Sequence, residues 1–153
     1  MEGALPHLLG VNVTPLAFAE ELVTDLIRMY PSLPAPPTHA QLGDLVVDCA
    51  GVYATVLNLT EYDLGSNCGS ILLADITIIA ARDCANVSND DGTTDWAKQD
   101  VVSTNMDADS EAMWEWAQKQ RADAFSPTTP PSVTYMITGA VALTSLAVQL
   151  PVP

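Results

Sequence analysis

The stretch ILLADITIIAA, residues 71–81, decides the fold of this chain. It is rich in β-branched residues, too short to span a bilayer, and bounded by turn-forming residues at 68–70 and 86–92. This pattern predicts a strand that is buried on at least one face and central in a sheet. One face is wholly apolar, whereas the other, formed by Leu73, Asp75, Thr77 and Ile79, includes a lone charge. We expect this second face to contact a helix or a neighbouring subunit.

A second long apolar stretch, residues 45–59, precedes the first and alternates in the same way. Gly51 in its middle predicts a bulge or bend. The polar residues 61–70 predict a loop that is too long for a two-residue turn. The two stretches are therefore expected to form a long antiparallel hairpin.

The C-terminal part is uncharged from residue 124 onward and mostly apolar over 135–152. Thr, Ser, Gln and Gly residues interrupt the apolar run, which favours strands over a transmembrane helix. We expect strands at 133–137 and 141–150, with a bulge near 144–145 where the apolar positions change parity. No membrane partner is expected.

Two main helices are predicted. The first begins at Thr14-Pro15, an N-cap followed by proline, and its apolar residues recur at helical spacing to residue 30. The second opens with the acidic residues 107–111 and runs to residue 125, with its basic residues near the end. Asp95 is expected to cap a separate, short helix.

Four residues are candidates for a subunit interface: Trp114, Trp116, Leu73 and Ile79. The two tryptophans point to different faces of the second helix, so we expect one in the core and the other on a partner surface. Leu73 and Ile79 lie on the mixed face of the central strand. These four form the candidate interaction site.

The sequence therefore predicts an α+β fold, a mostly antiparallel sheet built on a long hairpin plus C-terminal strands and covered by two main helices. We expect an N-terminal arm at residues 1–13 and a single domain at 14–153. Residues 31–40, which contain four prolines, are expected to be a stiff, extended connector within that domain.

The acidic composition and the absence of known catalytic motifs exclude several classes of function. The chain has 5 Lys and Arg against 19 Asp and Glu, a net charge of −14, so it lacks the clustered cations that grip nucleic acid. Its three cysteines include no CxxC pair, and the oxygen-rich residues 86–95 lack calcium-loop spacing. No nucleophile-elbow, P-loop or HExxH motif is present. We expect no enzyme activity, no catalytic residues, no metal and no cofactor.

The order of elements resembles that of the tail terminator family, small neck proteins of long-tailed bacteriophages. The matching segments are the opening helix, the paired strands, the second helix and the C-terminal strand: 16–30, 45–59, 71–83, 109–125 and 140–150. The resemblance extends over residues 14–152 as one of element order, length and composition, and it includes no diagnostic motif.

The resemblance implies a structural virion protein that forms a six-fold ring, a homohexamer, on the last ring of the tail tube. Such a ring stops tube growth and contacts the head-side neck or stopper protein. DNA passes through its channel without sequence-specific binding, and an acidic wall suits that passage. The family also implies synthesis in the host cytoplasm and localisation in the virion tail.

Two alternatives stay open. One is another neck protein, such as a head-closure or tail-completion subunit. The other is a small non-viral α+β module that binds a partner or a ligand.

Overall fold

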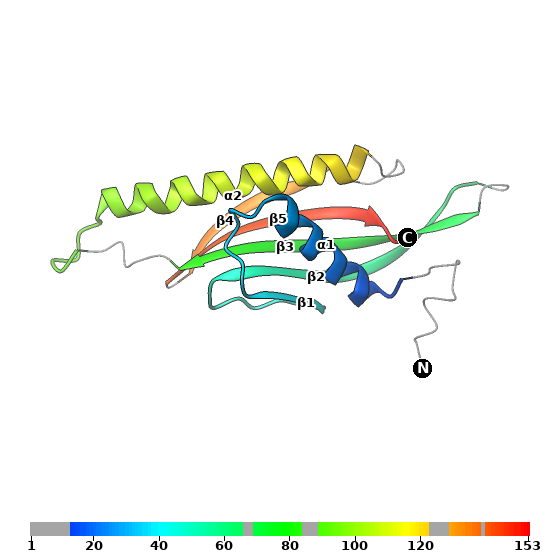
Figure 1. Ribbon diagram of the computed structural model, residues 1–153, viewed down its shortest axis with the longest axis horizontal. Helices are drawn as coiled ribbons and strands as arrows, with labels where there is room; N and C mark the ends of the chain where they lie inside the picture. The colour runs from blue at the N-terminus through cyan, green and yellow to red at the C-terminus, as the bar shows by residue number, and fades with distance from the viewer. Residues whose placement is uncertain (1–12, 66–68, 84–88, 123–128, 139) are drawn as a thin grey trace.

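The computed structural model describes residues 13–65, 69–83, 89–122, 129–138 and 140–153. Two helices pack on one face of a five-stranded sheet, so the predicted α+β fold is confirmed (Figure 1). The elements in chain order are α1 (Pro15–Met29), β1 (Thr38–Leu42), β2 (Gly51–Asp63), β3 (Ser70–Asp83), α2 (Trp96–Ala122), β4 (Ser132–Thr138) and β5 (Val141–Pro151).

The sheet has the strand order β1-β2-β3-β5-β4, so β3 is its central strand, as residues 71–81 predict. β2 and β3 form the predicted antiparallel hairpin, with Gly51 opposite Ala81 and Asp63 opposite Ser70, so the strands extend into both ends of the loop predicted at 61–70. β5 closes the other side of β3, and β4 pairs with β5. Only β1 is parallel to its neighbour, β2.

Two predicted irregularities are wrong. The register of β2 shifts between Val56 and Asn58, not at Gly51, which instead begins the strand. β5 keeps one register with β3 from Val141 to Pro151, so it has no bulge near Thr144. The apolar positions of β5 change parity because its first residues are buried on both faces of the sheet.

The segment before β2 also differs from the prediction. The expected Pro-rich connector, residues 31–40, runs directly into strand β1, which begins right after Pro37. Residues 43–50, expected to begin the long strand, form an irregular segment instead. Its side chains Leu45 and Val47 pack on the reverse face of the sheet, the face opposite the helices. The alternating apolar residues therefore belong to a segment that packs across the sheet, and not to a hydrogen-bonded strand.

The first helix begins as predicted. The hydroxyl oxygen of Thr14 accepts a hydrogen bond from the backbone N–H of Ala17 at 3.2 Å, and Pro15 is the first helical residue. The helix ends at Met29, directly before Tyr30 and Pro31. Its buried residues face β1 and β2.

The second helix is longer than predicted: α2 joins the short helix at Trp96 and the helix expected from residue 107 into one. Asp95 caps its start, since its carboxylate accepts the N–H of Lys98 at 3.2 Å. Val102 and Met106, one turn apart, pack against Ala142 of β5 and continue the buried stripe of the helix toward its start. No Pro or Gly interrupts residues 96–122.

Both helices contribute to one main core on the helix face of the sheet. This core contains Leu22 and Leu26 of α1, Met113 and Trp116 of α2, and Ile76 and Ile78 of β3, among others. The predicted arm at residues 1–13, apart from Val13, lies outside the described residues. So do Cys68, Cys84 and residues 123–125, the expected end of the second helix.

Candidate interaction surface

The two tryptophans of the candidate site have separate roles, as expected. Trp116 is fully buried, and its indole N–H donates a hydrogen bond to Asp25 of α1 at 3.0 Å. Trp116 therefore joins the two helices inside the chain and presents no surface to a partner. Trp114 is 43% exposed and remains available for contact.

The prediction that Leu73 and Ile79 are accessible to a partner is wrong, because both side chains are buried within the chain. Ile79 packs in a small reverse-face cluster with Tyr53, and the segment 43–50 covers that cluster through Leu45 and Val47. The helices lie on the other face of β3. Residues 43–50 of the same chain therefore cover part of the reverse face of the sheet.

The lone charge on that reverse face has a partner. Asp75 accepts a hydrogen bond from the side-chain amide of Gln149 at 3.0 Å, across the β3–β5 pair. The amide oxygen of Gln149 in turn accepts the backbone N–H of Thr129 at 3.2 Å. This chain of bonds explains how a carboxylate can lie half-buried in the central strand.

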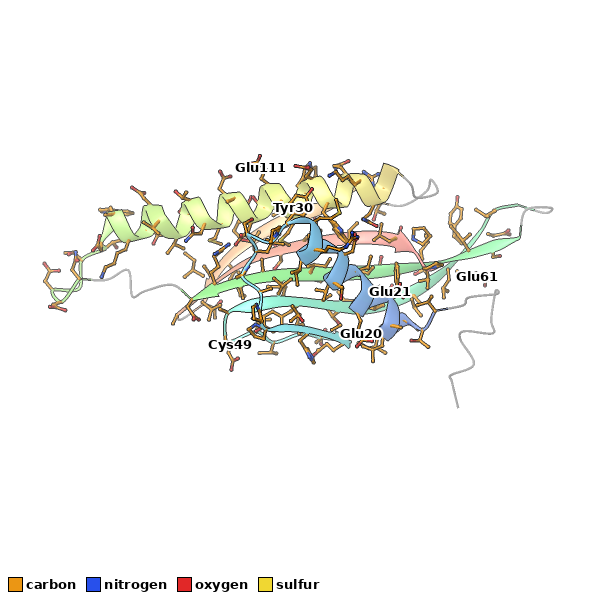
Figure 2. The ribbon with its side chains drawn as sticks, in the orientation of Figure 1. Glu20, Glu21, Tyr30, Cys49, Glu61 and Glu111 are labelled. Carbon is orange, nitrogen blue, oxygen red and sulfur yellow. The ribbon has the colours of Figure 1, made fainter. Side chains whose placement is uncertain are left out.

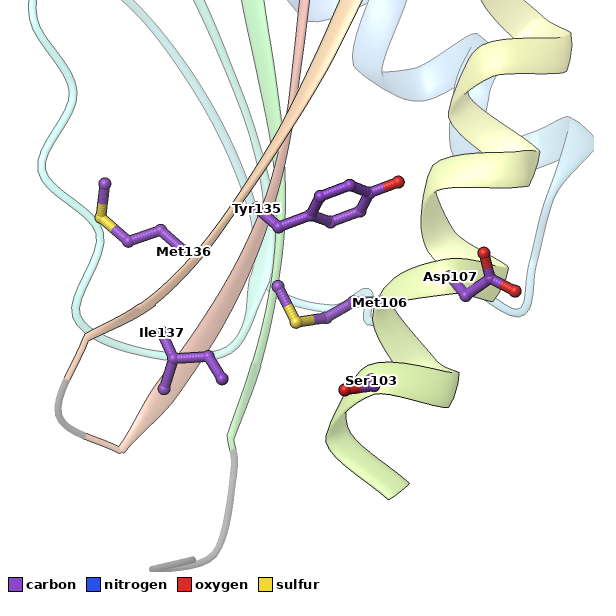
Figure 3. A pocket seen from close by; sticks show the side chains of 6 residues that line it. All are labelled: Ser103, Met106, Asp107, Tyr135, Met136 and Ile137. Carbon is purple, nitrogen blue, oxygen red and sulfur yellow. The ribbon is translucent and has the colours of Figure 1, made fainter. Parts of the chain in front are cut away.

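A different surface stands out on β4, which forms one edge of the sheet. Three consecutive apolar side chains are exposed there: Tyr135 by 56%, Met136 by 60% and Ile137 by 42%. Tyr135 and Ile137 pair with Thr144 and Ala142 and point toward α2, whereas Met136 points to the reverse face (Figure 3).

Beside these residues lies a groove of about 600 Å³ between β4 and α2. Tyr135 and Ile137 line it from the strand, and Ser103, Met106 and Asp107 line it from the helix (Figure 3). The groove is open along the edge of the sheet and combines apolar walls with one carboxylate. It could receive an apolar side chain from a partner.

The edge strand lacks the features that normally prevent pairing with another chain. β4 reads SVTYMIT, with no charged residue and no proline. Edge strands of monomeric proteins usually carry a charge, a proline or a bulge. We name the exposed residues Tyr135, Met136 and Ile137, together with the groove, the β4 edge surface.

Sequence reasoning missed this surface, although it predicted the strand itself. The apolar run at 135–137 was visible, but a sequence does not say which strand lies at the edge of a sheet. The absence of any charged residue from position 124 onward is the sequence signal that could have drawn attention to it.

The basic side chains are mostly engaged within the molecule. Four of the five form ion pairs with carboxylates of the described residues: Arg28 with Asp25, Arg82 with Asp109, Lys98 with Asp95, and Lys119 with Glu115. Acidic side chains such as Glu20, Glu21, Glu61 and Glu111 are exposed on α1, β2 and α2 (Figure 2). The exterior is therefore strongly negative, in contrast to strand β4, which has no charged residue.

Cys49 is an exposed free thiol in the irregular segment. Its sulfur lies 3.2 Å from the phenol oxygen of Tyr53. In the part of the chain that the structure describes, no three His, Cys, Asp or Glu side chains gather as a metal site.

Comparison with known proteins adds no family: no protein-family model matches the chain, and no curated protein is significantly similar to it. Among the described residues, neither helix is long and apolar enough to cross a membrane.

Proposed function

We propose that this chain is a structural virion protein, the tail terminator ring subunit of a long-tailed bacteriophage. In this role the ring caps the tail tube, joins it to the head-side neck and lets DNA pass through its channel. The observation that carries the proposal is the β4 edge surface, where an uncharged strand exposes Tyr135, Met136 and Ile137 on a strongly acidic molecule. A chain of this kind is suited to associate through an edge while repelling phosphate elsewhere.

The architecture supports the same proposal. A helix, a long hairpin, a second helix and closing strands follow one another in the order that the resemblance requires. Because four of the five cations are already paired with carboxylates, few positive charges remain to hold DNA in place. DNA could therefore slide past such a wall.

The proposal is tested by adding the purified chain to polymerising tail-tube protein. We expect tubes that stop growing, with the added chain found only at one tube end by electron microscopy. A matched sample of the Met136→Lys variant, which charges the edge surface, should cap fewer tubes. Tubes of unchanged length, with no wild-type chain at their ends, would refute the terminator role.

The groove beside β4 favours one second candidate, a small module that binds a partner through an apolar anchor. In that case the purified chain would bind its partner one to one as a monomer. Sedimentation of the wild-type chain, alone and with tail tubes, distinguishes the two functions, because a ring subunit associates with itself in at least one of these samples.

A further inference from the structure

The sheet has two edges among the strands that the structure describes, β1 and β4, and neither strand contains Asp, Glu, Lys or Arg. β1 reads THAQL and β4 reads SVTYMIT. In a chain with 19 acidic residues, these two strands are places where another copy can approach without facing carboxylates along the strand. Like charges about 4 Å apart repel by roughly 1 kcal/mol even in water. Charge thus favours edge-to-edge contact between copies.

The strand directions allow the two edges to meet. β1 is parallel to β2, and each following neighbour in the sheet is antiparallel, so β1 and β4 run in opposite directions. A second copy, rotated about an axis parallel to the strands, therefore places its β1 antiparallel to the β4 of the first. This arrangement keeps the helices of both copies on the same side of the joined sheet.

The side chains on these edges also match. Leu42 of β1 pairs with Val56, a main-core residue, so it points to the helix side of the sheet, where it is 54% exposed. Tyr135 and Ile137 of β4 point to the same side and line the groove with Met106. In the joined sheet, Leu42 of one copy would face the groove of the other.

We infer that β4 of one copy pairs with β1 of the next copy, head to tail, with Leu42 covering the groove formed by Met106, Tyr135 and Ile137. Repeating the contact around an axis closes a ring and leaves no free sheet edge. The inference rests on the proposed self-association into a ring, but not on a role in the phage tail.

The test introduces a lysine at each sheet edge in a separate variant. Leu42→Lys blocks the β1 edge and Ile137→Lys blocks the β4 edge, while Val46→Lys, at a position that is 91% exposed, is the control for the added charge. Native mass and sedimentation measure assembly of the purified full chains. We expect each edge variant alone to be a monomer, with self-association weakened at least ten-fold, and the control to assemble like the wild type.

Mixing the two edge variants is the decisive step. Each retains one intact edge, so the mixture should form a one-to-one dimer and nothing larger. Hydrogen exchange should then show protection of residues 132–138 in Leu42→Lys and of 38–42 in Ile137→Lys. If an edge variant loses its circular dichroism signal, Leu42→Ser or Ile137→Ser replaces it.

The outcomes separate the inference from the proposed function. If wild type forms rings and both edge variants still do, the edge contact is wrong while the ring stands. If Leu42→Lys forms dimers with itself, β4 pairs with β4 and the head-to-tail contact is wrong. If the wild type stays monomeric at all concentrations, both the edge contact and ring formation by the free chain are overturned.

Discussion

The guanidinium of Arg82 in the central strand binds the carboxylate of Asp109 in α2 through two hydrogen bonds, of 2.7 and 2.8 Å. Asp109 is buried, and the same guanidinium also donates to the carbonyl oxygen of Ser32 at 2.8 Å. One side chain thereby connects β3, α2 and the turn after α1. The hydrogen bond to Asp109 raises the pKa of Arg82, so the guanidinium stays charged at ordinary pH.

Replacing Arg82 alone should lower the stability of the fold. Arg82→Met leaves a buried carboxylate without its partner, and we expect it to lower the free energy of unfolding by about 3 kcal/mol. The double variant Arg82→Met/Asp109→Leu removes both charges and should regain most of that loss. Urea unfolding measures both. Arg28→Met, at an exposed ion pair with Asp25, is the control and should change stability by less than about 1 kcal/mol. Equal losses at Arg82 and Arg28 would contradict this role.

Gly51, the first residue of β2, should not tolerate a side chain. Its φ is +151°, and an added Cβ would lie 2.7 Å from the carbonyl oxygen of Pro37 and 2.9 Å from the phenol oxygen of Tyr53. Gly51→Ala should therefore destabilise the fold by about 2–3 kcal/mol, measured by urea unfolding. Gly92→Ala shares a positive φ of +86° but meets no atom within 4 Å, so it should cost about 1 kcal/mol. Equal costs would mean that the close contact at Gly51 is unimportant.

Tyr53 holds the irregular segment 43–50 against the sheet. Its phenol hydrogen-bonds the carbonyl oxygen of Cys49 at 2.9 Å, and burial together with Cys49 raises the pKa of Tyr53 to about 12. The raised pKa means that the folded state favours the protonated phenol. Its contribution to stability is present below pH 10, the ordinary tyrosine value, and is lost as the pH rises toward 12.

Tyr53→Phe should lower stability by about 1 kcal/mol at neutral pH and speed hydrogen exchange across residues 43–50. Stability measured between pH 10 and 12 should fall more steeply in the wild type than in this variant. Tyr62→Phe, at an exposed tyrosine, should retain the wild-type slope. A slope unchanged by Tyr53→Phe would show that another group titrates there.

Substitution of Trp116 should lower the stability of the chain far more than substitution of Trp114, two residues earlier in α2. Trp116→Ala removes a fully buried side chain and its bond to Asp25, so it should cost about 3–5 kcal/mol in thermal or urea unfolding. Trp114→Ala should leave the stability of the separate chain within about 1 kcal/mol. Acrylamide should quench the fluorescence of the Trp116→Ala variant more completely, since the remaining tryptophans are exposed. Similar losses for both variants would reject this assignment.

The sequence predicted the fold class because its strongest patterns are local. Residues 71–81 form an apolar, β-branched run that predicts a strand buried on at least one face and central in a sheet, and β3 is indeed paired on both sides. Thr14-Pro15 carries its helix start in two adjacent residues. Strand β1 was not predicted, because the prolines before Thr38 indicate an extended connector. Its pairing with β2 is a contact that the local sequence does not show.

The candidate interaction surface could not be predicted from local sequence patterns. Leu73 and Ile79 resemble interface residues in sequence, but Leu45 and Val47, distant in the chain from β3, cover the cluster that contains Ile79. Conversely, Tyr135 to Ile137 read as an ordinary strand until β4 is found at the sheet edge. Burial and edge position depend on the order of strands in the sheet, which no single stretch contains.

The most direct test of the central claim is the native mass of the purified chain, measured alone and in the presence of tail tubes. A ring subunit predicts a species of six times the 16.2 kDa of one chain, free or bound to a tube end. A chain that remains a 16.2 kDa monomer in both samples would contradict the account.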